Sequence, residues 1–103
     1  MFSIIIPTFN NLEYLKLCLD SIKKNSKYSH EIIIHMNEGS DGTHEFLNKH
    51  NYIYTLSKEN VGVCVAFNKA VSKANNKFIV LAHDDMYFCP KWDYFLVDEI
   101  KSL

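Results

Sequence analysis

Phe78-Ile79-Val80-Leu81-Ala82-His83-Asp84-Asp85 is the stretch that decides the fold, because an apolar run ends abruptly in two adjacent carboxylates. Branched and aromatic residues followed by polar ones are typical of a buried strand. Such a strand brings its last residues to the carboxyl edge of a sheet, where open α/β folds bind ligands. Neighbouring carboxylates repel each other. They either ligate a cation such as Mg²⁺ or Mn²⁺, or form an exposed turn that merely ends the strand.

Strands and helices are expected to alternate along the rest of the chain. The apolar patterns predict strands over 2–6, 32–34, 52–56 and 78–82, and helices over 12–24, 43–50, 62–75 and 91–102. Pro7 is expected to end the first strand, and Asn10 or Asn11 to cap the helix after it. We therefore predict an α/β fold, a three-layer α/β/α sandwich around a mostly parallel sheet with right-handed crossovers.

Composition sets the class of molecule. The 103 residues fit a single domain, 1–103, and no apolar run approaches the roughly 20 residues that span a bilayer. The N-terminus lacks the basic region of a signal peptide, and three scattered cysteines favour reduced thiols and the cytoplasm. A net charge of −1 argues against a nucleic-acid partner. All 11 basic residues are lysine, so an anion must be held by lysine, backbone N–H groups or metal.

Several further placements are expected from the pattern alone. Apolar positions of the last helix are expected to be buried, namely Trp92, Phe95, Leu96 and Ile100. Asp93 is expected on the solvated face of that helix, and Asp41 and Thr43 are expected to cap the second helix. His35 is interpreted as structural, and His30, His44 and His50 as surface residues. Lys58 and Lys69 are the lysines expected nearest to bound phosphate.

Four segments, in order and at matching spacing, resemble a known family. Residues 3–10 read Ser-Ile-Ile-Ile-Pro-Thr-Phe-Asn, and 31–43 end in Ser-Asp-Gly-Thr. Residues 60–68 contain Asn-Val-Gly and Ala-Phe-Asn, and 83–85 take the place of an Asp-x-Asp metal motif. Together they resemble the N-terminal half of family 2 glycosyltransferases, the GT-A nucleotide-sugar enzymes, over nearly the whole chain.

The resemblance implies binding of a nucleotide-diphospho-sugar, with a UDP-sugar favoured and a GDP-sugar as the other candidate. It implies a divalent cation, Mn²⁺ or Mg²⁺, held by Asp85 with help from His83, and inverting transfer of the sugar to an unknown acceptor. The substrate-binding residues that it implies are Pro7, Thr8, Phe9, Asn10, Asn37, Glu38, Gly62, Asn68 and Asp84.

Departures from the family pattern qualify these expectations. His83 replaces the first Asp of the motif, so it is either a weak ligand or a filler. Met36 and Asn37 fall where the family has an Asp that reads uracil, and Phe67 replaces an arginine. The acceptor-binding half and the catalytic base of the family lie beyond the metal motif, so the catalytic residue in this chain is unknown.

Other interpretations remain open at this point. Phe9 either stacks on the base or belongs to the core, and Gly62 either donates N–H groups to phosphate or simply begins a helix. The chain contains neither a GxxxxGK nor a GxGxxG motif, which argues against other phosphate-binding folds. The main alternative function is a non-catalytic nucleotide-sugar-binding module, or one that forms homo-oligomers through an exposed sheet edge or apolar face.

Overall fold

The computed structural model describes residues 1–103, in which four strands alternate with four helices. The strands are β1 (Phe2–Phe9), β2 (Glu31–Asn37), β3 (Ile53–Ser57) and β4 (Phe78–Leu81). The helices are α1 (Leu12–Asn25), α2 (Thr43–Lys49), α3 (Val63–Val71) and α4 (Tyr94–Lys101). This order confirms the predicted α/β fold. None of the helices is long and apolar enough to cross a membrane.

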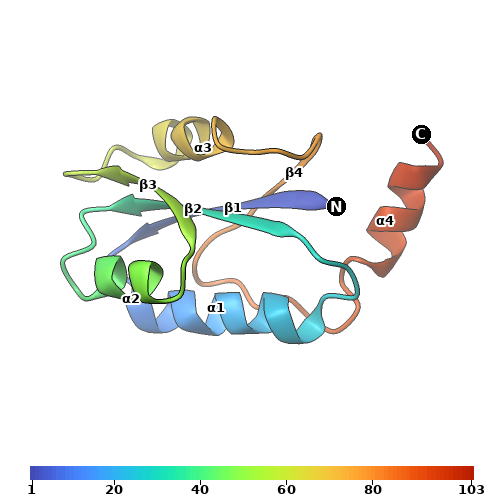
Figure 1. The fold of residues 1–103 in the computed structure, drawn as a ribbon, viewed down its shortest axis with the longest axis horizontal. Coiled ribbons are helices and arrows are strands. Elements are labelled where there is room, and N and C mark those ends of the chain that lie inside the picture. The colour runs from blue at the N-terminus through green and yellow to red at the C-terminus, as the bar shows by residue number, and fades with distance from the viewer.

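All strands run parallel in one sheet with the order β3-β2-β1-β4. Figure 1 shows α1 and α2 on one face and α3 on the other, which gives the three predicted layers. Helix α4 lies beyond the amino ends of the strands, beside the N-terminus. Because β1 has β2 on one side and β4 on the other, the loops after β1 and β4 meet at a switch point of the sheet.

The prediction that Pro7 ends the first strand is wrong, because β1 continues to Phe9 and Pro7 pairs in register with His35 of β2. The backbone of Ile5 faces β4, since its C=O accepts from the N–H of Ala82. Pro7, two residues later, faces the same side, and β4 pairing has ended by then at Ile5↔Leu81. The missing N–H of proline therefore costs no ladder hydrogen bond.

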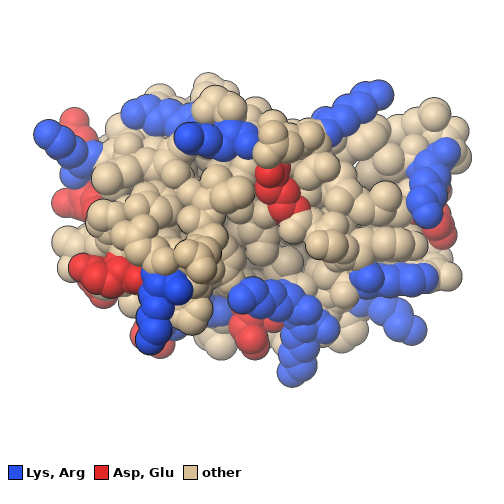
Figure 2. Space-filling view, in the orientation of Figure 1, with Lys and Arg blue, Asp and Glu red and all other residues tan.

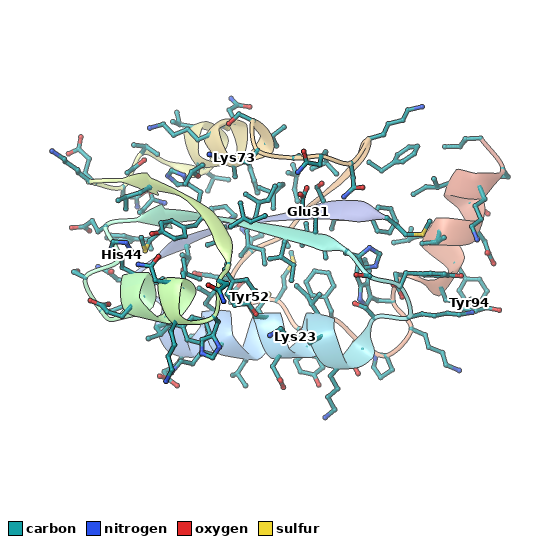
Figure 3. All side chains as sticks on the ribbon, viewed as in Figure 1. Lys23, Glu31, His44, Tyr52, Lys73 and Tyr94 are labelled. Atoms are coloured by element: carbon teal, nitrogen blue, oxygen red, sulfur yellow. The ribbon has the colours of Figure 1, made fainter.

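Alternation along β1 divides the core between the two faces of the sheet. Ile4 and Ile6 pack with Leu15 of α1 in the larger apolar cluster, which also contains Val97 of α4. Ile5 points to the opposite face and packs in a smaller cluster under α3. Each of these isoleucines is fully buried. Lys23 of α1 extends over the ring of Tyr52, with its Nζ 5.3 Å from the ring centroid, and Tyr52 in turn packs against the larger cluster (Figure 3).

Two helices are shorter than the pattern predicts. Helix α3 ends at Val71 rather than at 75, and its terminal valines, Val63 and Val71, are exposed. Helix α4 begins at Tyr94 and buries Val97 instead of Phe95, which is 75% exposed. Leu96 is also exposed, so the expected burial of Phe95 and Leu96 is wrong. Val97 and the partly buried Ile100 are the residues of α4 that pack against the larger cluster, because the helix lies beyond the end of the sheet.

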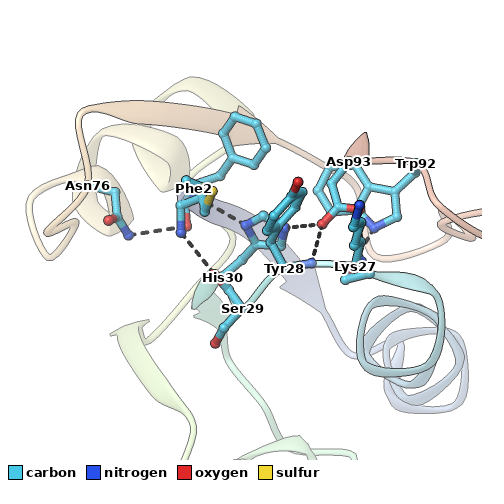
Figure 4. Close-up of polar contacts among 10 residues, drawn as sticks. Phe2, Lys27, Tyr28, Ser29, His30, Asn76, Trp92 and Asp93 are labelled. Carbon is cyan, nitrogen blue, oxygen red and sulfur yellow. Dashed lines mark hydrogen bonds and ion pairs between the residues drawn. The ribbon is translucent and has the colours of Figure 1, made fainter. Parts of the chain in front are cut away.

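His30 and Asp93, expected at the surface, instead form a buried pair (Figure 4). Nε2 of His30 lies 2.6 Å from Asp93 Oδ2, and the two side chains are 1% and 0% exposed. Nδ1 of His30 accepts from the N–H of Phe2, so the proton resides on Nε2 and is donated to Asp93. The carboxylate also accepts from the N–H groups of Lys27 and Tyr28. The pair ties the start of α4 to the start of β1.

Candidate functional site

An open pocket with a volume of about 330 Å³ lies at the carboxyl ends of β1 and β2, between the start of α3 and the loop after β4. This is the edge at which the sequence predicts a ligand site. The lining residues are Pro7, Thr8, Phe9, Asn11, Asn37, Asn60, Gly62, Val63, His83 and Asp84.

Most of the residues predicted for the site line this pocket, and four do not. Asn10, Glu38, Asn68 and Asp85 lie outside the lining. The side chain of Asn10 is bound to the next loop, because it accepts from the N–H of Ser40 at 3.0 Å. Glu38 has a positive φ of 61° and donates its own N–H to Ser57, so its backbone shapes the turn. Asn68 is exposed on α3.

Three lining residues were missed, namely Asn11, Asn60 and Val63. Asn11 occupies the N-cap position of α1, but its side chain makes no capping bond; Asp41 accepts the N–H of Leu12 instead. Asp41 also accepts from the N–H of Thr43, the first residue of α2, but Gly42 occupies the N-cap position, so neither Asp41 nor Thr43 is the N-cap residue that was expected. The Asn-x-Gly motif, in which Asn60 precedes Gly62 by two residues, was the signal in the sequence that could have identified Asn60.

Asp84 is the carboxylate that faces the pocket. Its Oδ2 accepts from the hydroxyl of Thr8 at 2.8 Å, whereas Asp85 is exposed. The loop is supported from below by Cys18, whose Sγ lies 3.7 Å from the C=O of His83. Burial, followed by the nearby charges of Asp84 and Asp85, raises the pKa of Cys18 to about 12, so this thiol is protonated and unreactive.

The side chains at this pocket supply only some of the ligands that a metal cation needs. No group of three or more His, Cys, Asp or Glu side chains is arranged to hold a metal ion. Asp84 retains a free Oδ1, and Asp85 follows it directly in an exposed position. One or two carboxylates completed by phosphate oxygens and water is a usual arrangement for Mg²⁺ in nucleotide sites. The residues therefore fit a cation that arrives with an anionic ligand.

Asn37 is almost completely buried, with 3% of its surface exposed. Its Nδ2 donates to the C=O of Thr8 at 3.3 Å, and its Oδ1 accepts from the N–H of Val61 at 3.1 Å. Both ends of the amide are thus bonded to backbone on opposite sides of the pocket.

The start of α3 is less open to an anion than the sequence suggests. Gly62 adopts a φ of 84°, which favours glycine, and its N–H donates to Oδ1 of Asn60 at 3.0 Å. This bond forms a local turn and occupies the Gly62 N–H, which favours the interpretation that Gly62 simply begins the helix.

No lysine lines the pocket. On the face shown in Figure 2, lysine side chains lie mostly around the periphery, interspersed with acidic ones. Lys69 donates to the hydroxyl of Ser57 at 3.4 Å, and Ser57 in turn contacts Nε2 of the buried His35. Burial, followed by the charge of Lys69, lowers the pKa of His35, so this residue is neutral and structural, as expected.

Comparison with solved structures identifies the class of fold. The structure of S. aureus TarS 1-349 in complex with UDP superimposes with a TM-score of 0.85 over 98% of this chain and 32% of that chain, at 22% identity. The mannosyltransferase PcManGT of Pyrobaculum calidifontis, in complex with GDP-Man and Mn²⁺, gives a TM-score of 0.74 over 91% of this chain and 30% of that chain, at 23% identity. The protein thus has the GT-A glycosyltransferase fold.

Sequence comparison then identifies the family. Residues 3–103 match Glycosyl transferase family 2, and the chain belongs to this family. The putative glycosyltransferase EpsH of Bacillus subtilis (strain 168) is 27% identical over 95 residues. That alignment covers 87% of this chain and 27% of EpsH, so the chain spans about a quarter of the length of this relative.

Proposed function

We propose that residues 1–103 form the donor side of a family 2 glycosyltransferase and bind a nucleotide-diphospho-sugar for inverting transfer to an acceptor. The observation that carries this proposal is the pocket at the switch point of the sheet, into which Thr8 directs Asp84. Structurally similar proteins contain UDP in one case and GDP-Man with Mn²⁺ in another, which supports a nucleotide ligand of either base.

A divalent cation, Mn²⁺ or Mg²⁺, would be held by Asp85 and Asp84, with His83 beside them. When bound, it would neutralise the diphosphate and stabilise the departing nucleotide. The pocket has no lysine in its lining and the chain has no arginine, so the protein supplies little positive charge of its own. Pro7 and Phe9 provide an apolar edge for the base, and Thr8 and Asn37 maintain the pocket floor.

The acceptor site and the general base are not among the residues assigned here. We propose that they belong to a part of the enzyme that this chain does not include, since the chain spans 27% of EpsH and 32% of the TarS chain. All three cysteines are free thiols, which supports a reducing compartment such as the cytoplasm.

Calorimetric titration tests nucleotide binding. UDP and GDP would each be titrated into the protein with and without Mn²⁺, and into Asp85→Asn and Asp84→Asn variants. We expect binding that requires Mn²⁺, is lost in Asp85→Asn and is measurably weakened in Asp84→Asn. Nucleotide binding of equal strength without Mn²⁺, or in both variants, would contradict the proposed site.

The second candidate is a self-associating module without catalysis, favoured by the open edge of β4. This strand ends the sheet, carries no charged residue, and leaves Leu81 54% exposed. Unprotected apolar edges pair with other strands. Light scattering over a range of concentrations would detect association, and Leu81→Lys should reduce it. A strict monomer at high concentration would exclude this candidate.

A further inference from the structure

We propose that Thr8 and Asn37 are positioning residues, which hold Asp84 in its ligand-facing orientation: Asn37 fixes the backbone of Thr8, and the hydroxyl of Thr8 fixes Asp84. The inference rests on the proposed function, since it assigns these residues a role in ligand binding at the same pocket. It changes the interpretation of Asn37, which the sequence suggested as a residue that reads the nucleotide base.

The chain of bonds crosses the floor of the pocket in three steps. Val61 N–H donates to Asn37 Oδ1 at 3.1 Å, and Asn37 Nδ2 donates to the C=O of Thr8 at 3.3 Å. The hydroxyl of Thr8 then donates to Asp84 Oδ2 at 2.8 Å. The four residues come from the segment before α3, the end of β2, the end of β1 and the loop after β4. Four segments far apart in sequence are thereby fixed to one another.

Burial increases the energetic cost of losing any of these hydrogen bonds. Thr8 is 2% exposed and Asn37 is 3% exposed, so water cannot readily replace a lost partner. An unpaired polar group in such a position costs its full desolvation energy, whereas an exposed one is simply rehydrated. Asp84 itself is half-buried, which leaves its second oxygen open to the pocket.

The residue types match the direction of each bond. An amide has a donor at one end and an acceptor at the other, so Asn37 can bridge a C=O and an N–H. A carboxylate at position 37 would place an unprotonated oxygen against the C=O of Thr8. Threonine supplies the hydroxyl donor that Asp84 needs. Thr8 also pairs with Met36 of β2, and a strand position of this kind suits its β-branched side chain.

Restraint of Asp84 has a direct consequence for ligand affinity. A side chain that is already held in its binding orientation loses less conformational entropy when it engages a cation or a ligand hydroxyl. Thr8 occupies Oδ2, so Oδ1 is the oxygen that is presented to the ligand. The two positioning residues act on the ligand only through this carboxylate.

A set of matched variants tests the proposal. The affinity for UDP and for GDP in Mn²⁺ would be measured for wild type, Thr8→Val, Thr8→Ser, Asn37→Asp and Asp84→Asn. Thr8→Val keeps the shape but removes the donor, and should weaken binding about tenfold, the usual effect of losing a hydrogen bond to a charged group. Thr8→Ser retains the hydroxyl and should restore most of the affinity. Asn37→Asp should weaken binding of both nucleotides alike.

A double variant separates positioning from a general loss of structure. Thr8→Val combined with Asp84→Asn should bind no more weakly than Asp84→Asn alone, because Thr8 acts through that carboxylate. Additive losses would overturn the proposal, and so would wild-type affinity in Thr8→Val. An Asn37→Asp variant that bound UDP more tightly than wild type would show that position 37 reads the base instead.

Hydrogen exchange of the free protein distinguishes failure of this inference from failure of the proposed function. The Val61 amide should lose protection in Asn37→Ala and keep it in Thr8→Val. If Val61 is equally protected in all variants, the chain of hydrogen bonds does not exist. If its protection changes as expected but wild type binds neither nucleotide, the proposed function is wrong, and the positioning role for ligand binding falls with it.

Discussion

At the scale of single residues, His35 makes stability depend on pH in the mildly acidic range. Its ring nitrogens contact the hydroxyls of Thr55 and Ser57 at 2.6 Å and 2.9 Å, and its side chain is fully buried. Burial, followed by the charge of Lys69, lowers the pKa of His35 below its ordinary value of 6.5. The unfolded chain therefore binds a proton that the folded chain excludes, and stability falls as the pH drops below about 6.5.

The His35→Gln variant tests this dependence, because glutamine keeps a donor and an acceptor but does not titrate. Urea unfolding would be measured for wild type and variant at about pH 5 and about pH 7.5, on either side of the pKa of free histidine. We expect wild type to lose more stability than the variant on acidification. An equal loss in both proteins would mean that His35 is not the titrating group.

The buried pair of His30 and Asp93 predicts a second dependence of folding stability on pH. Burial alone would raise the pKa of Asp93, but the N–H groups of Lys27 and Tyr28 and the ring of His30 outweigh it and lower that pKa. The stability from this carboxylate is present above the ordinary pKa of an aspartate and is lost as the pH falls through the folded value. Asp93→Asn should cost about 3 kcal/mol, because it turns an amide group toward buried donors.

Urea unfolding of Asp93→Asn at neutral pH measures that cost. Asp98→Asn is the matched control, since Asp98 lies on the same helix and is exposed. Its free energy of unfolding should change by less than about 0.5 kcal/mol. Equal stability of Asp93→Asn and wild type would contradict the assignment of the pair as an anchor of α4.

At the scale of elements, Val97 should be the main apolar anchor of α4, with the partly buried Ile100 also packed against the core. Val97 is fully buried, whereas Phe95 is 75% exposed. Val97→Ala should therefore lower the free energy of unfolding by about 2 kcal/mol, and Phe95→Ala should leave it nearly unchanged. Thermal unfolding of the two variants measures the difference. A larger loss of stability in Phe95→Ala than in Val97→Ala would contradict this orientation of α4.

The predictable elements are those whose pattern is local. Helix α1 follows from its spaced leucines, and β2 and β4 from their unbroken apolar runs. The face of α4 was not predictable, because adjacent apolar residues fit several helical faces. The length of β1 was not predictable either, since tolerance of Pro7 depends on where its neighbour β4 ends.

As with the fold, the sequence predicted part of the candidate site and missed the rest. The motifs identified Thr8, His83 and Asp84, because each lies close to the carboxyl end of β1 or β4, where the pocket is. The roles of Asn37 and Asp93 depend on partners 24 to 66 positions away in sequence, which no local pattern encodes. Asn11 lacked a signal because the expected capping role gave its side chain a different partner.

At the scale of the whole molecule, the match to Glycosyl transferase family 2 and the GT-A fold agree with each other, and a pocket lies at the switch point of the sheet. The polar floor of that pocket joins the ends of three strands with the start of α3. On the α1 side of the sheet, twelve buried residues pack together in one apolar cluster. We infer that the chain holds a preformed donor pocket.

The most direct test is an NMR titration of the isotope-labelled protein with UDP in the presence of Mg²⁺, repeated with GDP. The account predicts that amide signals of Thr8, Phe9, Asn37, Gly62 and Asp84 shift first and together, while those of α4 stay unchanged. Shifts confined to residues outside the pocket, or none with either nucleotide at saturating concentration, would contradict the claim that this pocket binds the donor.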